Sequence, residues 1–89
     1  MSDAGKDLDT RRRRCLYRAN HRGTKELDVL IGNCAALAVP AADASELALW
    51  EHLVEVPDPD LYDWIALANP VTRPEFEGLV ARIRAHNMR

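Results

Sequence analysis

The sequence predicts an all-α protein, a compact five-helix antiparallel bundle that forms one domain over residues 10–89. Apolar residues recur at helical spacing in five successive segments, and no segment alternates apolar and polar residues as a half-buried strand does. Turns that contain proline or glycine separate most of these segments. A chain of 89 residues has room for one hydrophobic core, and short turns should make consecutive helices antiparallel neighbours.

The first helix should run from Leu8 or Thr10 to His21, after a flexible N-terminal tail over residues 1–9. Thr10 is the expected N-cap. Gly23 is placed where a helix ends in a left-handed residue. The apolar stripe of this helix is thin and consists of Leu8, Cys15, Leu16 and Ala19.

The second helix, about residues 24–38, has the most regular pattern and should be the central core helix. Its apolar residues recur three and four positions apart and are Leu27, Leu30, Ile31, Cys34 and Leu37. Gly32 within this helix costs about 1 kcal/mol relative to alanine. We therefore expect another helix to cross closely at Gly32.

The last three helices begin at capping signals. Asp43 with Glu46 three positions later predicts the start of the third helix. Asp58 should cap a fourth helix over residues 59–68, and Thr72 to Glu75 forms a capping box for the fifth. The expected core residues of these helices are Leu47, Trp50, Leu53 and Val54, then Leu61, Trp64, Ile65 and Ala68, and finally Phe76, Leu79, Val80 and Ile83.

Composition and chain ends indicate a cytoplasmic protein of a bacterium that does not bind membranes. The chain is 47% hydrophobic and 29% charged, as in ordinary globular proteins. No apolar run approaches the roughly 20 residues of a membrane span, and the polar first nine residues differ from a secretory signal or transit peptide. Cys15 and Cys34 lie on apolar helix faces, so we expect buried thiols and no disulfide.

The charges are divided unevenly along the chain. The net charge is −2, yet residues 1–25 carry +5 and residues 26–89 carry −7. Such a dipolar molecule favours oriented docking on a protein partner. A stripe of arginines should follow one side of the first helix, and its members are Arg11, Arg14, Arg18 and Arg22.

This arginine stripe has two main interpretations, which the sequence leaves open. It is either a solvated face whose long side chains cover apolar surface, or a docking surface for an acidic protein. Nucleic-acid binding by the run Arg11 to Arg14 is a weaker third alternative. Four consecutive helical residues spread around the helix and cannot form one tight patch.

Neither catalysis by this chain nor a metal site is expected. No nucleophile is paired with a base at a recognisable spacing, and there is no glycine-rich phosphate loop. His21, His52 and His86 belong to three different helices and lack zinc-ligand spacing. The acids around Asp60 lack the pattern of a calcium loop, and helix capping explains them.

The turn from Arg22 to Glu26 is the most informative segment for binding. Gly23 interrupts the helices, so a partner's backbone could approach it closely. Arg22 offers a planar fork for carboxylates. Glu26, in the first turn of the second helix, is favoured by the helix dipole and can accept hydrogen bonds from a partner. The residues alone leave both a structural turn and a binding surface open.

The same turn resembles a family signature. Arg22-Gly23-x-x-Glu26, followed by Leu27-Asp28, resembles the R-G-x-x-E motif of the SdhE/YgfY family, the flavinylation factors of succinate dehydrogenase. Leu53-Val54-Glu55 and the run Asp58 to Trp64, which is similar to D-P-D-L-x-x-W, follow in the right order. The likeness covers about residues 11–86. Many members carry Arg and Met where this chain has His21 and Thr24.

The resemblance implies an assembly factor that binds the flavoprotein subunit of succinate dehydrogenase and promotes covalent attachment of FAD. Fumarate reductase flavoproteins are further candidate clients. Arg22, Gly23 and Glu26 carry over as the partner-binding residues, with Asp28 and Arg18 as neighbours.

In the family, a histidine of the flavoprotein attacks the 8α-methyl group of the flavin. The resemblance therefore implies that this chain is no enzyme and binds no FAD tightly, because the cofactor is attached on the partner. The alternative is a regulator, such as an antitoxin-like binder of another protein.

Overall fold

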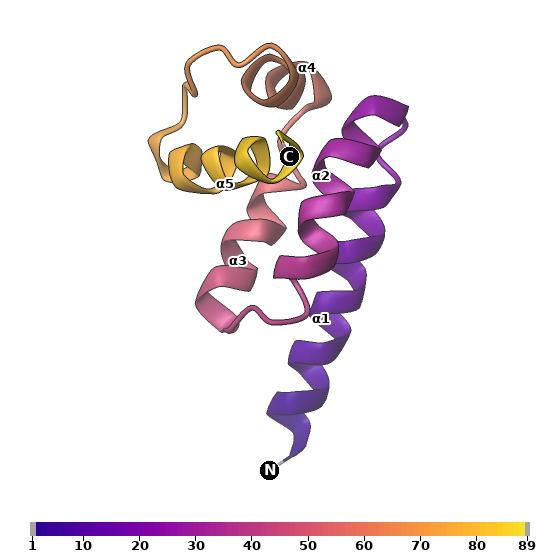
Figure 1. Ribbon diagram of the computed structural model, residues 1–89. Coiled ribbons are helices and arrows are strands. Elements are labelled where there is room, and N and C mark those ends of the chain that lie inside the picture. Colours follow the sequence, from indigo (N-terminus) through magenta and orange to yellow (C-terminus); the bar gives the residue numbers. More distant parts are fainter. Residues whose placement is uncertain (1, 89) are drawn as a thin grey trace.

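The first two helices form an antiparallel hairpin. The computed structural model describes residues 2–88, and side chains from residue 7 to residue 88. Helix α1 spans Ser2–Asn20 and α2 spans Lys25–Ala38, and the two run side by side in opposite directions (Figure 1). Gly23 lies between them with φ 93°, which confirms the predicted left-handed residue.

Helix α1 begins before the residue predicted to cap it. Thr10 lies inside α1, so the predicted N-cap there is wrong. Asp9 and Arg12 form an ion pair of 3.0 Å one turn apart, and such pairs support a helix at this point. The flexibility of residues 1–9 stays a prediction.

Helix α2 lies at the centre of the core, as predicted, in contact with α1 and with the C-terminal elements. A side chain at Gly32 would collide with the amide of Asn20 on α1, which confirms the close helix crossing. Leu37 is 70% exposed, and its assignment to the core is wrong. The buried face is centred on Leu27, Ile31 and Ala35, so Leu37 falls beyond its edge.

Helix α3, Ala44–Leu53, begins at the predicted cap. The Asp43 carboxylate accepts a hydrogen bond of 2.9 Å from the backbone N–H of Glu46. The four residues predicted for its core face, from Leu47 to Val54, are all buried. The indole N–H of Trp50 has no hydrogen-bond partner among the described residues.

Helix α4, Asp58–Leu61, continues into the π-helical turn η1, Tyr62–Ala66. Leu61, Trp64 and Ile65 are buried, as predicted. Ala68 is exposed and has φ 57°, so its assignment to a helical core face is wrong. The chain leaves the helix at Ala68 in the left-handed conformation that often follows a helix C-terminus.

Helix α5, Glu77–Asn87, follows a short 3-10 turn, η2, Pro74–Phe76. The predicted capping box at Thr72 is wrong, because η2 begins after the extended Arg73 and no side chain caps it. Arg73 instead pairs with Glu75 at 3.2 Å and lies over the Phe76 ring. The four predicted core residues of this helix, from Phe76 to Ile83, are buried.

The all-α, five-helix fold is thus confirmed, and the described residues include no strand. Helix α5 packs against α2 and η1, and in Figure 1 it crosses the direction of the α1–α2 hairpin. Within residues 2–88, no helix is both long enough and apolar enough to cross a membrane.

Candidate docking surface at the turn between α1 and α2

The guanidinium of Arg22 points into the molecule. Its Nε donates to Asp58 Oδ1 at 2.8 Å and its Nη2 donates to the carbonyl of Val56 at 2.7 Å, while Nη1 donates to the carbonyl of Val54. The side chain is only 9% exposed. The fork that we expected to face a partner's carboxylate is therefore occupied within the chain.

Asp58 links the same turn to α4. Its second carboxylate oxygen, Oδ2, accepts a hydrogen bond of 3.2 Å from Thr24 Oγ1. The prediction that Asp58 caps the fourth helix is wrong, since Asp58 is the first residue of α4 and no side chain caps that helix. Its carboxylate is used by Arg22 and Thr24 instead.

Asp28 holds the turn from the other side. Its Oδ1 accepts a hydrogen bond of 2.6 Å from the backbone N–H of Arg22. Arg22 is thus fixed through both its backbone and its side chain. The predicted site residues Arg22 and Asp28 have a positioning role in the structure, and their direct contact with a partner stays a prediction.

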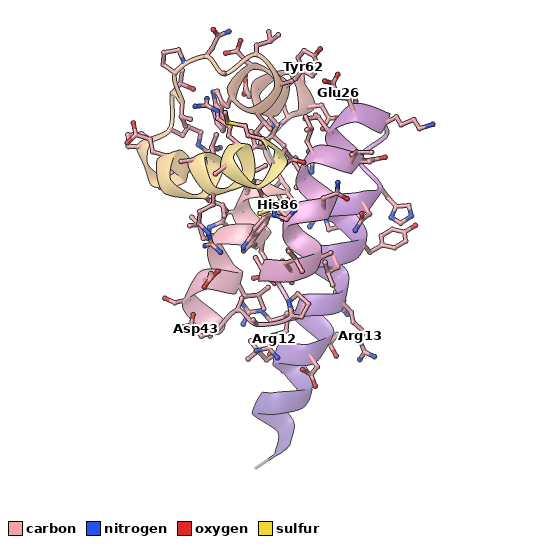
Figure 2. The ribbon with its side chains drawn as sticks, in the orientation of Figure 1. Arg12, Arg13, Glu26, Asp43, Tyr62 and His86 are labelled. Carbon is pink, nitrogen blue, oxygen red and sulfur yellow. The ribbon has the colours of Figure 1, made fainter. Side chains whose placement is uncertain are left out.

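Gly23 and Glu26 are the accessible part of the turn. Both residues are exposed, and a Cβ at Gly23 would have no other atom within 4 Å. Among the side chains described, none forms a hydrogen bond or an ion pair with the Glu26 carboxylate. Figure 2 shows Glu26 near the start of α2, on the same end of the molecule as Tyr62. At this end of the molecule, the backbone at Gly23 and the carboxylate of Glu26 are accessible to a partner.

Three of the four arginines of the stripe pair with acids of α3, of the turn after it and of α4. Arg11 binds Glu51 at 2.7 Å and Arg18 binds Glu55 at 3.3 Å. With the pair of Arg22 and Asp58, these contacts follow α1 and the turn after it in order. The opposite charges of the two parts of the sequence therefore neutralise each other partly inside the molecule, and Arg18 is engaged in an exposed intramolecular pair.

The ion pair of Arg11 and Glu51 is shorter than that of Arg18 and Glu55 and has two hydrogen bonds. Arg11 donates to Glu51 through Nε at 3.1 Å and through Nη2 at 2.7 Å. These hydrogen bonds, followed by the charge of Arg11, hold the pKa of Glu51 below its usual range although partial burial opposes them. The same bonds raise the pKa of Arg11.

The run Arg11 to Arg14 does not form one patch. Arg12 donates from Nη2 to the carbonyl of Ala42 at 2.7 Å, at the turn before α3. Figure 2 shows Arg12 and Arg13 projecting to different sides of α1. Two of the four arginines are engaged in the fold, which weakens the nucleic-acid interpretation.

The described residues contain no group of three His, Cys, Asp or Glu side chains placed to hold a metal ion. Cys15 and Cys34 are buried and not bonded to each other. Burial raises the pKa of Cys15 to about 11, and the nearby Glu51 carboxylate acts in the same direction. These thiols are poor nucleophiles.

Sequence reasoning placed Thr24 in the turn but missed its hydrogen bond to Asp58, and it missed Asp58 as part of the turn's structure. The D-P-D segment was visible in the sequence, but its acids were assigned to capping. Nothing in the local sequence showed that Asp58 lies against a residue 36 positions earlier.

Together, the fold and this surface define a small all-α protein with a hydrogen-bonded turn that exposes a glycine and a carboxylate. The chain belongs to the family described as the flavinator of succinate dehydrogenase, whose model matches residues 13–87.

Several named proteins are similar to this chain. The FAD assembly factor SdhE of Acetobacter pasteurianus is 48% identical over 59 residues, which are 66% of this chain and 54% of that protein. The SdhE of Acinetobacter baylyi is 35% identical over 78 residues, covering 88% and 91%. The mitochondrial succinate dehydrogenase assembly factor 2 of Dictyostelium discoideum is 32% identical over 81 residues, covering 91% and 57%.

The aligned region spans little more than half the length of the Acetobacter and Dictyostelium relatives. No solved structure matches this chain.

Proposed function

We propose that this protein is an assembly factor that binds the flavoprotein subunit of succinate dehydrogenase and promotes its covalent flavinylation. The family and the names of the relatives support this role. The observation that carries the proposal is the buried network of Arg22, which holds Gly23 and Glu26 outward on one rigid turn.

A rigid turn suits a docking role. Binding costs less conformational entropy when the contact surface is already ordered. The turn is fixed by hydrogen bonds to α2, α4 and the carbonyls that follow α3. Gly23 allows a client's backbone to come close, while Glu26 accepts hydrogen bonds from a client's donors.

The covalent chemistry belongs to the client in this proposal. This chain would favour the client conformation in which the flavin and the attacking histidine are correctly placed. It would therefore act without being an enzyme and without binding FAD tightly. A fumarate reductase flavoprotein is a second candidate client, and the expected location is the bacterial cytoplasm.

Loss of flavinylation in a deletion strain tests the proposal. The gene is deleted in its own host, and covalent flavin on the flavoprotein subunit is measured by in-gel fluorescence. We expect the band to fade, and to return when the wild-type gene is restored. An undiminished band in the deletion strain would overturn the proposal and favour a regulator of another protein.

Glu26→Gln is the sharpest site variant, since it removes a charge and keeps the shape of the side chain. Losing a charged hydrogen bond should weaken client binding by about 1.5–3 kcal/mol. Glu77→Gln is the matched control, because Glu77 is also an exposed acid in the first turn of a helix. Equal flavinylation by the two variants would remove Glu26 from the site.

Gly23→Arg also tests the surface, but its effect has two sources. A φ of 93° is strained for any residue with a Cβ, although the space around Gly23 is open. We expect this variant to lose client binding and also some stability. Its binding therefore has to be measured on the folded fraction.

A further inference from the structure

Glu26 also lines a groove that the family motif does not describe. This groove has a volume of about 290 Å³ and lies between α2, η1 and the end of α5. Its other lining residues include Leu30, Ile65, Ala66, Arg84 and Met88. The surface proposed above therefore continues from the turn into a hollow.

The polar side chains of the groove's far wall are already engaged. Arg84 donates from Nε to the carbonyl of Trp64 at 2.7 Å and from Nη2 to that of Asn69 at 2.8 Å. Asn87 donates from Nδ2 to the carbonyl of Leu30 at 2.8 Å. The groove is lined by two charged residues, Glu26 and Arg84, and only the Glu26 carboxylate is not used in these hydrogen bonds.

The wall itself has an irregular backbone. In η1, Leu67 N–H bonds to the carbonyl of Tyr62 at 3.0 Å, and Asn69 N–H bonds to that of Asp63 at 3.0 Å. Ala68, which also lines the groove, has φ 57°. Single π-turns and left-handed residues other than glycine cost energy and often mark functional sites. Arg84 binds one carbonyl within this irregular segment, that of Trp64, and one at its end, that of Asn69, and so supports it.

The charges around the groove favour a cation. Between Glu26 and Thr72 the sequence has no Lys or Arg. Glu26 is the one acid among the residues that line the groove, and Lys25 precedes it at the start of α2. The cation of Arg84 is directed to backbone carbonyls. The negative charge of Glu26 at the edge of the groove would attract and orient a basic segment of a partner.

We propose that this groove receives a bulky apolar side chain of the client flavoprotein, next to a Lys or Arg that pairs with Glu26. This inference rests on the proposed function and names the chemistry of the client segment. Leu30, Ile65 and Met88 supply the apolar contact. The volume of about 290 Å³ is at the small end of the roughly 300–1,000 Å³ of ligand sites, so it suits one side chain better than a dinucleotide.

A large side chain placed in the groove tests whether an apolar side chain of the client binds there. Affinity for the purified succinate dehydrogenase flavoprotein subunit is measured by calorimetry for wild type, Ala66→Phe and Ala36→Phe. Ala66 lines the groove, whereas Ala36 is exposed on α2 and is not part of it. We expect Ala66→Phe to weaken binding by about tenfold or more, a typical effect at an interface centre, and Ala36→Phe to bind like wild type.

A rim variant covers the case in which Ala66→Phe fails to fold. Met88 is 83% exposed, so replacing it leaves the core intact. Met88→Lys should weaken binding because it replaces part of the apolar contact with a charge that repels the client's Lys or Arg, while Met88→Leu should retain affinity. The groove proposal would be overturned if Met88→Lys and folded Ala66→Phe both bound the client with wild-type affinity. If Ala66→Phe does not fold, wild-type affinity of Met88→Lys alone would overturn it. Either result would leave the proposed function standing.

Cross-linking identifies the occupant. A photoreactive amino acid is placed at position 88, the complex is irradiated, and the linked peptide is sequenced. We expect a client peptide with a bulky apolar residue beside a Lys or Arg. A client peptide without a basic residue, or a peptide from a second copy of this chain, would overturn the inference. Absence of binding by the wild type would overturn the proposed function itself.

Discussion

Arg22 in the turn after α1 and Asp58 at the start of α4 form a hydrogen-bonded ion pair of 2.8 Å, although 36 positions separate them. Two of the segments by which the sequence resembles its family, R-G-x-x-E and D-P-D, therefore meet in one network. Arg22 shapes the surface from beneath. Glu26 remains at the surface.

Arg22→Lys should lower the free energy of unfolding by about 2–4 kcal/mol. Lysine cannot reproduce a fork that reaches Asp58 and two carbonyls at once, and breaking a buried pair typically costs about 3–5 kcal/mol. Arg18→Lys is the control, because the pair of Arg18 and Glu55 is exposed and longer. Its expected cost is below about 1 kcal/mol.

Urea unfolding followed by circular dichroism measures both variants. Equal stability of Arg22→Lys and Arg18→Lys would contradict the structural role assigned to Arg22.

Gly32→Ala should destabilise the protein by about 1–3 kcal/mol, because the new methyl group meets the side chain of Asn20. The group that the new methyl meets is the side-chain amide of Asn20, so removing this amide should turn the destabilisation by Gly32→Ala into a stabilisation. In an Asn20→Ala background, Gly32→Ala should stabilise the helix by about 0.5–1 kcal/mol. A double-mutant cycle by thermal unfolding checks this, and additive effects would show that the crossing is looser than described.

The ion pair of Arg11 and Glu51 should make stability depend on pH. The folded state holds the pKa of Glu51 below its usual range, mainly through the hydrogen bonds from Arg11. A lowered pKa stabilises the fold above the unfolded value of about 4.3. That stabilisation is lost as the pH falls through the folded pKa.

Glu51→Gln should therefore be less stable than wild type by about 0.5–1 kcal/mol at pH 7. The difference should begin to shrink as the pH falls below about 4.3 and should vanish only below the folded pKa of Glu51. Urea unfolding of both proteins at a series of pH values measures this difference in stability. A difference that stays constant with pH would show that Glu51→Gln acts through packing and not through the charge of Glu51.

The sequence predicted the helices and most of the core, because burial on one helix face leaves a local, periodic pattern. Gly23 and the Asp43 cap were predictable for the same reason, because each depends on the neighbouring residues in the sequence. Gly32 was predictable because a glycine inside a helix indicates a close contact, although the contacting residue, Asn20, lies on α1. The errors at Thr10, Thr72 and Ala68 concern where helices begin and end, because side chains of capping type or apolar type occur whether or not a helix ends there.

The candidate site was only half predictable. Local sequence indicates that Arg22, Gly23 and Glu26 flank a turn, but an arginine can face a partner or the protein interior. That choice depends on where Asp58 lies, which only the packing of α4 against the hairpin decides. The groove beside Glu26 joins residues of α2, η1 and α5, and no local pattern connects them.

The thiol of Cys15 should resist alkylation in the folded protein. Its pKa of about 11 leaves about 0.1% thiolate at pH 8, against roughly a quarter for an unperturbed cysteine with a pKa near 8.5. Burial also raises the pKa of Cys34, and both side chains are shielded from reagent. Labelling with a thiol reagent at pH 8 should therefore be more than 100-fold slower in buffer than in urea, where both thiols react. A fast phase in buffer that is lost in Cys15→Ala would show that α1 opens from α3, and that the pair of Arg11 and Glu51 does not hold it closed.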